Sequence, residues 1–430
     1  MKKSFLVFLN ILLGVLLANS QTGLWSGDLE VMGVKLPLVF HLDDNNPTLD
    51  SPAQGARGVP IQIKRIGTDS LSITVPSIRA TFRGKYESEH ITGLFTQNGF
   101  QVPLVLTPGE KTLHRPQTPK PPFPYGQEEV SFSNGDAVLK GTLTLPEGYS
   151  RETPVLIMIT GSGLQNRDEE LFEHKPFAVI ADALARNGIA SLRYDDRGFA
   201  ESTGDVVNCT TADLMNDALA GINLLRQKFN KVGALGHSEG GTISLMLGAD
   251  NKVDFIVSMA GMVISGKETL LDQNHYTLIQ NGYDQQTVDE YCDLLSLAFD
   301  NNNSVSQKLE SSTLPAELKQ NLRMVIQQSK TPYMQYFISI NIMNRLPDIT
   351  SPVLALNGTK DIQVSYEKNL GALSKGLPSN IHNKIIPLDN LNHIFQNCKT
   401  GSLKEYATIE ETVSPEVLEI ITQWVKSLNK

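Results

Sequence analysis

A serine between two glycines is the stretch of this chain with the clearest chemical meaning. Gly236-His237-Ser238-Glu239-Gly240 follows a short apolar segment at 231–235 and precedes a helix-like run at 241–247. A turn that bends so sharply from strand to helix exposes its central residue and leaves no room for a Cβ two positions before or after it. Because both flanking glycines meet that requirement, the serine is predicted to be a nucleophile.

A nucleophilic hydroxyl needs a base that removes its proton and a carboxylate that orients the base. His393 follows the predicted strand 384–388, and Asp361 lies on the loop after the predicted strand 353–356. A capping or surface histidine and a turn aspartate that bonds its own backbone are the alternatives. The order Ser238, Asp361, His393 favours a catalytic triad, because one large class of serine hydrolases carries its triad in that order.

An oxyanion forms during such an attack and needs backbone N–H donors. The N–H of Glu239, the residue after the predicted nucleophile, is the first expected donor. The second is expected from the loop Gly161-Ser162-Gly163, with Ser162 N–H as first choice and Gly163 N–H as second. A tight turn without a ligand is the alternative for these glycines. No Gly-Lys-Ser/Thr follows the loop, which disfavours a phosphate site.

Strand and helix signals that could position these groups alternate along the chain. Helices are predicted at 177–186 and 211–229, and apolar strands at 155–160, 189–193, 231–235, 255–259, 353–356 and 384–388. Continuously apolar strands that alternate with helices indicate a mostly parallel sheet covered on both faces. Active sites of such sheets lie at the carboxyl ends of the strands, so the predicted triad is expected at one edge.

Four segments together resemble the α/β-hydrolase superfamily, and more narrowly the secreted bacterial carboxylesterases grouped with serine aminopeptidase-like hydrolases that carry an N-terminal β domain. They are the serine turn 236–240, the loop 161–168, the segment 193–198 (Arg-Tyr-Asp-Asp-Arg-Gly) and the segment 356–361 (Leu-Asn-Gly-Thr-Lys-Asp). The resemblance implies the α/β-hydrolase fold, with a mostly parallel central sheet and a helical cap insertion. It also implies ester hydrolysis through an acyl-enzyme without a metal or an organic cofactor.

Two other interpretations stay open. The same triad cleaves amides, so a serine peptidase of the aminopeptidase type is the second. It would need an acidic group for a free amino terminus, and Glu239 and Asp168 are the candidates. The third, from another class, is a carbohydrate- or envelope-binding protein in which the N-terminal β domain is the working part. The complete set of candidate catalytic groups disfavours this third interpretation.

Charged residues cluster in the segments that resemble the family. Arg167, Asp168, Asp195, Asp196 and Arg197 could bind a polar substrate. Paired opposite charges on neighbouring loops more often brace those loops against each other. A metal site at the two adjacent aspartates lacks the accompanying His or Glu spacing. We therefore expect bracing ion pairs and no metal.

The amino terminus has the pattern of an export signal. Lys2 and Lys3 precede an apolar run at 5–17, and Ala18-Asn19-Ser20 offers small residues for cleavage, so a signal peptide is predicted at 1–20. The run is shorter than the ~20 residues that a membrane-spanning helix needs. We expect a periplasmic or extracellular protein without stable membrane insertion after cleavage.

The remainder of the chain divides into segments that differ in composition and hydrophobic pattern. Alternating apolar and polar residues at 21–110 predict a small antiparallel β domain or part-barrel, in which Trp25 packs inside rather than on a sugar. A Pro-rich linker is predicted at 111–127 and the α/β-hydrolase domain at 128–430. Within that domain, about 265–345 interrupts the sheet and predicts a cap over the nucleophile.

Substrate contacts are expected beside the predicted oxyanion loop and on the cap. Aromatic residues at helical spacing in the cap could line an acyl pocket, although that spacing is also typical of core packing. The pocket candidates are Leu164, Gln165, Tyr333, Met334, Tyr336 and Phe337.

Composition narrows the possible partners. The chain has 37 Lys and Arg against 46 Asp and Glu, a net charge of −9 with no concentrated basic segment, so nucleic acid is a poor partner. Cys209, Cys292 and Cys398 permit at most one internal disulfide, which excludes a disulfide-dense scaffold. The predicted partner is a small-molecule ester. No pattern in the chain specifies an oligomeric state.

Overall fold

The computed structural model describes residues 22–428 apart from positions 32, 44, 68, 88, 111 and 112, so the predicted signal peptide at 1–20 lies outside the described residues. The chain folds into two compact units. The first comprises the residues up to His114 together with Leu171–Glu173, and the second comprises Arg115–Glu170 and the chain from His174 onward. Across the described ranges, no helix is both long and apolar enough to cross a membrane.

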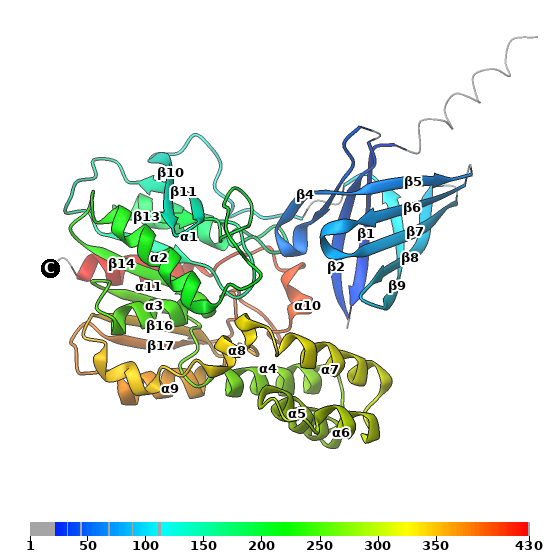
Figure 1. Ribbon diagram of the computed structural model, residues 1–430. Helices are drawn as coiled ribbons and strands as arrows, with labels where there is room; N and C mark the ends of the chain where they lie inside the picture. The colour runs from blue at the N-terminus through cyan, green and yellow to red at the C-terminus, as the bar shows by residue number, and fades with distance from the viewer. Residues whose placement is uncertain are drawn as a thin grey trace, which may run out of the picture. The chain divides into compact units, whose positions relative to one another are not determined.

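Nine antiparallel strands form the first unit: β1 (Leu24–Val31), β2 (Val34–His41), β3 (Thr48–Ser51), β4 (Ala56–Pro60), β5 (Gln62–Ile66), β6 (Ser70–Val75), β7 (Ala80–Glu87), β8 (His90–Gln97) and β9 (Phe100–Pro108). Their order in the sheet is β4-β3-β2-β1-β9-β8-β7-β6-β5. Although β4 and β5 end this order on opposite sides, only Ile61 separates them in the chain, so the sheet curls until its two ends meet (Figure 1). The N-terminal antiparallel β domain is therefore present.

Alternation along the strands builds the core of this unit. Strand β6 buries Leu71, Ile73 and Val75 and leaves the residues between them partly exposed, as the two-residue period of a strand requires. Trp25 is 3% exposed and meets the Tyr86 ring edge-on, with the centroids 6.1 Å apart. The prediction that Trp25 packs inside the unit is confirmed.

Eight strands form the sheet of the second unit: β10 (Gly126–Asn134), β11 (Ala137–Leu145), β12 (Val155–Ile159), β13 (Ala190–Tyr194), β14 (Val232–His237), β15 (Ile256–Met259), β16 (Val353–Gly358) and β17 (Lys384–Leu388). The order is β10-β11-β13-β12-β14-β15-β16-β17. β11 pairs antiparallel with both β10 and β13, and all later neighbours pair in parallel. The predicted mostly parallel sheet is present, with every predicted strand within two residues of its observed ends.

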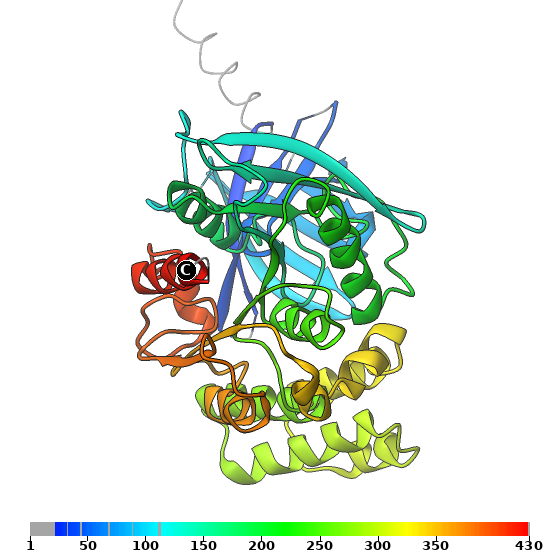
Figure 2. The same ribbon diagram turned by 90° about the vertical axis from the view of Figure 1, so that its left-hand side faces the viewer.

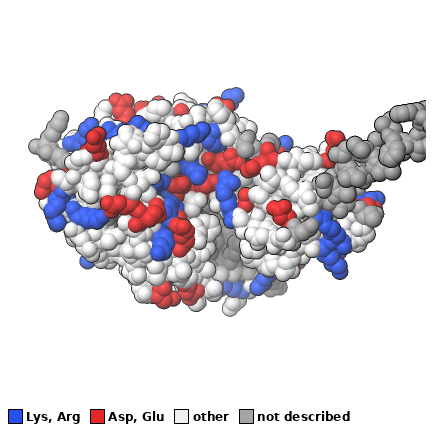
Figure 3. Space-filling model, turned by 90° about the horizontal axis from the view of Figure 1, so that it is seen from above, with Lys and Arg blue, Asp and Glu red and all other residues white. Residues whose placement is uncertain are grey.

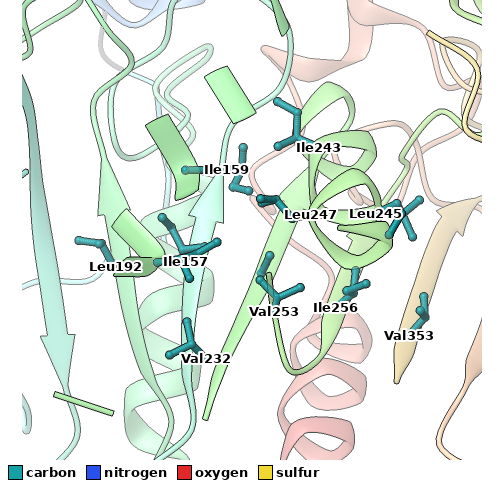
Figure 4. Close-up of a cluster of buried hydrophobic side chains, with 14 of the residues drawn as sticks. Ile157, Ile159, Leu192, Val232, Ile243, Leu245, Leu247, Val253, Ile256 and Val353 are labelled. Carbon is teal, nitrogen blue, oxygen red and sulfur yellow. The ribbon is translucent and has the colours of Figure 1, made fainter. Parts of the chain in front are cut away.

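Helices cover both faces of this sheet (Figure 2): α1 (Pro176–Arg186) and α11 (Pro415–Ser427) one face, and α2 (Thr211–Leu225), α3 (Glu239–Ala249) and α9 (Tyr366–Gly376) the other. Side chains of β12 alternate between the two layers. Ile157 and Ile159 pack on the side of α3 (Figure 4), whereas Leu156 and Met158 pack on the side of α1 and α11. A strand buried on both faces must be apolar throughout, which explains the continuous apolar run.

A helical cap separates β15 from β16: α4 (Gly266–Gln280), α5 (Gln285–Phe299), α6 (Val305–Ser311), α7 (Ala316–Gln328), α8 (Pro332–Ser339) and a 3-10 turn at Met343–Asp348. Its first helices share a small core of their own, which includes Tyr291, Leu295 and Leu322. α8 packs into the main core through Phe337. A short helix, α10 (Leu403–Tyr406), lies in the loop region after β17.

Charges on the surface are mixed in sign. On the face seen in Figure 3, Lys and Arg side chains lie among Asp and Glu side chains across the second unit. On the cap, Glu310 of α6 and Arg323 of α7 form an exposed ion pair, with an N–O distance of 2.9 Å and side chains 64% and 51% exposed. Such pairs add little to stability because water screens them.

A buried ion pair links the loop after β13 to α2. The three cysteines are free thiols, so packing and buried polar contacts hold this unit together. Arg197 donates to Asp217 through Nε at 2.7 Å and Nη2 at 2.6 Å, and the side chains are 7% and 1% exposed. Asn134 Nδ2 also donates to Asp217, at 2.8 Å. Removing either partner of such a buried pair leaves the other charge uncompensated, so both residues are needed for stability.

Asp217→Ala is expected to lower the free energy of unfolding of the second unit by about 3 kcal/mol, because Arg197 stays buried without a counter-charge. Glu310→Ala breaks the exposed pair with Arg323 and serves as the control, with an expected change below about 1 kcal/mol. Denaturant unfolding followed by circular dichroism measures both changes. Equal losses in the two variants would contradict the expectation.

Candidate active site

Ser238 lies at the bend between β14 and α3. Its backbone has φ 53° and ψ −118°, a conformation that residues with a side chain rarely adopt. A Cβ on Gly236 would lie 1.9 Å from the carbonyl oxygen of Gly240, and a Cβ on Gly240 would lie 2.0 Å from that of Ile159. Both glycines are therefore required, as the sequence predicts, and the bend has the strained geometry of a nucleophile elbow.

The structure brings Asp361 and His393 into direct contact. His393 Nδ1 lies 2.7 Å from Asp361 Oδ2, and the two side chains are 6% and 0% exposed. Asp361 Oδ1 accepts the N–H groups of Gln363 at 2.8 Å and Val364 at 2.9 Å, while Oδ2 also accepts Asn357 Nδ2 at 3.0 Å. A carboxylate held in this way accepts a hydrogen bond from Nδ1–H, which keeps the proton on Nδ1 and leaves Nε2 available as a base. We assign this tautomer from the contact.

The order of the strands explains why residues 32 positions apart meet. β16 and β17 are parallel neighbours, so the loops that follow them leave the sheet at the same edge. A Cβ on Gly358, at the end of β16, would lie 2.1 Å from the carbonyl oxygen of Leu391. The glycine therefore lets the two loops touch, and Asp361 can reach His393.

The serine elbow adjoins the His393 loop through His237. His237 Nε2 lies 2.9 Å from the backbone oxygen of His393, and the two ring centroids are 4.7 Å apart. Among the described residues, the Ser238 hydroxyl makes no direct hydrogen bond to the His393 ring. Such contacts are often long before substrate binds. The structure thus joins Asp361 to His393 directly. Ser238 is linked to His393 through its neighbour in the chain, His237, which contacts the His393 backbone.

The loop after β12 passes beside the serine. A Cβ on Gly161 would lie 3.2 Å from the Cβ of Ser238. Ser162 and Gly163 follow and are exposed. Glu239 is the first residue of α3, where N–H groups have no acceptor within the helix. These are the donors that the sequence proposes for an oxyanion, and their convergence on one atom stays a prediction.

Ion pairs hold this loop in place. Asp195 accepts the Arg167 backbone N–H at 2.8 Å and its guanidinium at 2.7 Å. Asp168 pairs with Arg193. Asp196 is buried, which raises the pKa of its carboxyl group, and it accepts a backbone N–H of the loop at 2.8 Å. The charges brace the loop, in agreement with the structural interpretation of these residues.

The Glu239 side chain is buried between the elbow and the cap, with 1% of the residue exposed. It accepts the Thr211 hydroxyl at 2.6 Å and the Tyr333 hydroxyl. Burial raises the pKa of the Glu239 carboxyl group, while hydrogen bonds from Thr211, Tyr333 and Ser162 act in the opposite direction. The carboxylate therefore fastens α8 of the cap to the elbow.

The aromatic pocket candidates of α8 face the main core. Tyr333 and Phe337 are one helical turn apart with ring centroids separated by 5.9 Å, and Phe337 is 7% exposed. Tyr336 packs against the same core. Core packing therefore describes Phe337 and Tyr336, whereas Tyr333 also contacts the elbow carboxylate. Leu164 is exposed, Gln165 and Met334 are half-buried, and the place of these three candidates in a pocket stays a prediction.

Two buried residues to which the sequence analysis gave no role lie beneath the elbow. Glu169 Oε1 accepts the Gly161 N–H at 2.7 Å and lies 2.9 Å from His237 Nδ1. Glu169 adopts φ 52°, a backbone conformation that residues with a side chain rarely adopt. The sequence motif shows a histidine directly before the predicted nucleophile. It does not show that Glu169 is the partner of this histidine, because only the folded course of the loop brings the two together.

A strained serine elbow on a mostly parallel sheet, with an Asp–His pair at the ends of neighbouring strands, defines a serine hydrolase of the α/β-hydrolase fold. Residues 134–385 match the family described as X-Pro dipeptidyl-peptidase (S15 family), and the chain belongs to this family. The predicted fold class is confirmed.

Similar proteins include esterases and a peptidase. Esterase EstD of Thermotoga maritima is 25% identical over 354 residues, which cover 80% of this chain and 78% of the relative. Among solved structures, esterase Pf2001 of Pyrococcus furiosus is 15% identical with a TM-score of 0.45, covering 74% of this chain and 99% of that chain. Proline iminopeptidase of Mycobacterium smegmatis is 14% identical with a TM-score of 0.45, covering 70% and 99%.

Gly240→Ala is expected to reduce reaction with a serine-directed fluorophosphonate probe on the order of 100-fold, because the new Cβ must displace the elbow and a ~1 Å misplacement can cost that much. Gly371→Ala in α9 is the matched control, since its Cβ would meet no atom within 4 Å. The control should label like the wild type and be slightly more stable through helix propensity. Full labelling of Gly240→Ala would show that the elbow tolerates a Cβ.

Proposed function

We propose that the chain hydrolyses carboxylic esters through an acyl-enzyme on Ser238, with His393 as the base and Asp361 as the orienting carboxylate. The observation that carries the proposal is the 2.7 Å contact between Asp361 Oδ2 and His393 Nδ1, beside a serine held at φ 53°. The name of the relative from Thermotoga maritima, an esterase, gives further support.

Acylation begins when Ser238 Oγ attacks the ester carbonyl carbon while His393 Nε2 removes the hydroxyl proton. Asp361 stabilises the imidazolium that forms, because its carboxylate already accepts Nδ1–H. Negative charge develops on the carbonyl oxygen, and the N–H groups of Glu239 and of Ser162 or Gly163 receive it. His393 then gives its proton to the departing alkoxide, which leaves the acyl group on the serine.

Deacylation repeats these steps with water as the nucleophile. His393 Nε2 takes a proton from the water, whose oxygen attacks the acyl carbon, and the proton then returns to Ser238 Oγ as the acid leaves. Every proton transfer in this scheme uses one imidazole nitrogen. The saturated hydrogen bonding of Asp361 keeps that nitrogen oriented through both halves of the reaction.

Peptide hydrolysis is the second candidate, and the description of the matching family favours it. An aminopeptidase-like enzyme needs an acidic group that is available to the substrate ammonium. Both candidates are engaged within the protein: Glu239 accepts the hydroxyls of Thr211 and Tyr333, and Asp168 pairs with Arg193. These contacts support the ester proposal over the peptidase, because a clamp would have to exchange an existing partner for the substrate.

Ser238→Ala is expected to lower kcat for a short-chain p-nitrophenyl ester on the order of 10⁶-fold with the fold intact, because no hydroxyl is left to accept the acyl group. Asp361→Asn should cost less, on the order of 10⁴-fold, since it disturbs only the orientation and charge of the imidazole. Steady-state kinetics and circular dichroism measure both. Undiminished turnover by Ser238→Ala would reject the assignment.

Parallel assays separate the two candidate activities. The wild-type chain is expected to have a higher kcat/KM for p-nitrophenyl butyrate than for aminoacyl and X-Pro p-nitroanilides, because Glu239 and Asp168, the two candidate groups for an amino terminus, already have partners within the protein. Ser238→Ala gives the background rate for each substrate. Faster cleavage of an anilide than of the ester would replace the ester proposal with the peptidase.

A further inference from the structure

His237 is held between two hydrogen-bond acceptors. Its Nδ1 lies 2.9 Å from Glu169 Oε1, and its Nε2 lies 2.9 Å from the backbone oxygen of His393. The histidine is 7% exposed and the glutamate 3%. Both contacts are therefore made inside the protein, where an unpaired polar group is costly.

Counting protons restricts the state of this pair. A neutral imidazole carries one N–H, so hydrogen bonds to two acceptors need a second proton, either on the ring or on Glu169. Glu169 Oε1 also accepts the Gly161 N–H at 2.7 Å, which favours an ionised carboxylate. We therefore assign an imidazolium paired with a carboxylate.

The surroundings of the ring agree with this assignment. Burial opposes a charge on His237, but the Glu169 charge and the hydrogen bonds to Glu169 and to the His393 carbonyl raise its pKa above the ordinary value overall. Asp361 and His393 are the other titratable groups near the ring. Apolar side chains, including Phe395, line the pocket behind it.

We propose that protonated His237, paired with Glu169, is a positioning residue for the ester hydrolysis proposed above, on which this inference rests. One ring N–H holds the main chain of the base His393. The other holds the carboxylate that fixes Gly161 at the start of the oxyanion loop. Because His237 directly precedes Ser238, one side chain connects the nucleophile, the base and the oxyanion loop.

The proton also balances a charge beside the reacting atoms. The point that a Gly161 Cβ would occupy lies 3.2 Å from the Ser238 Cβ and 3.3 Å from Glu169 Oε1, so the carboxylate lies close to the serine. A negative charge there disfavours formation of the oxyanion, and the positive charge of the His237 imidazolium compensates for the Glu169 charge. The ring therefore acts through position and charge without touching the substrate.

Loss of the second ring proton of His237 predicts how activity and stability change with pH. Deprotonated His237 leaves either Glu169 or the His393 carbonyl without a donor, so activity falls as pH rises through the raised pKa of His237. Since the folded pKa lies above the unfolded one, the stability contributed by the pair is fully present below about pH 6.5 and is lost over the same rise in pH.

His237→Gln tests the inference, because its amide can donate to the His393 carbonyl but cannot titrate or pair with the Glu169 charge. We expect kcat for a p-nitrophenyl ester to fall on the order of 10- to 100-fold with KM little changed, and the alkaline decline of kcat to disappear. Glu169→Gln should lower kcat similarly. His382→Gln, a histidine before the start of β17, is the matched control and should keep the wild-type kcat and pH profile.

A spectroscopic measurement on the wild-type chain covers the case in which a variant fails to fold. With ¹⁵N-labelled histidine, both ring nitrogens of His237 should be protonated below about pH 6.5, and the signal that is missing from the His237→Gln spectrum or shifted in the Glu169→Gln spectrum identifies it. A singly protonated ring, or wild-type kcat and pH profile in both variants, would overturn the inference and leave ester hydrolysis standing. Wild-type protein without esterase activity would instead reject the proposed function.

Discussion

The close contact between the backbone of α3 and the end of β12 is the constraint on which the site depends. Gly240 lies so near the carbonyl oxygen of Ile159 that a methyl group does not fit between them. This contact holds the first turn of α3 against the strand whose loop carries Gly161 and Ser162. It therefore sets the distance between Ser238 and the loop amides, and it holds Ser238 in its strained conformation. Strain of this kind persists only where surrounding packing enforces it.

Around that contact the protein buries several carboxylates that have specific hydrogen-bond donors. Asp361 receives two backbone N–H groups, an amide and the His393 ring, and Asp196 receives a backbone N–H and the Thr160 hydroxyl. Glu239 receives two hydroxyls. Buried charges are tolerated when hydrogen bonds replace their lost hydration. The same hydrogen bonds join loops that leave different strands, so they also make this edge of the sheet rigid.

The sequence was most informative where one physical rule acts alone. Strands buried on both faces must be apolar, and an elbow must lack two Cβ atoms, so β12 to β16 and the position of Ser238 could be predicted. The helix predicted at 211–229 ends at Leu225, because the N–H groups of Gln227 and Lys228 bond to carbonyls three residues back instead of four. The role of Phe337 in the core could not be separated from a pocket role, since one helical face serves both. The Glu169–His237 contact depends on the course of a loop, which no periodicity encodes.

The cap has a consequence for how this enzyme can change over time. Its helices α5, α6 and α7 pack on a hydrophobic cluster of their own, apart from the core beneath the sheet, while α8 supplies the anchor through Phe337 and Tyr333. Substitutions inside that separate cluster can remodel these cap helices without disturbing the strands that position Ser238, Asp361 and His393. Such a division lets sequence changes accumulate in one module of the cap while the packing of the central sheet stays the same.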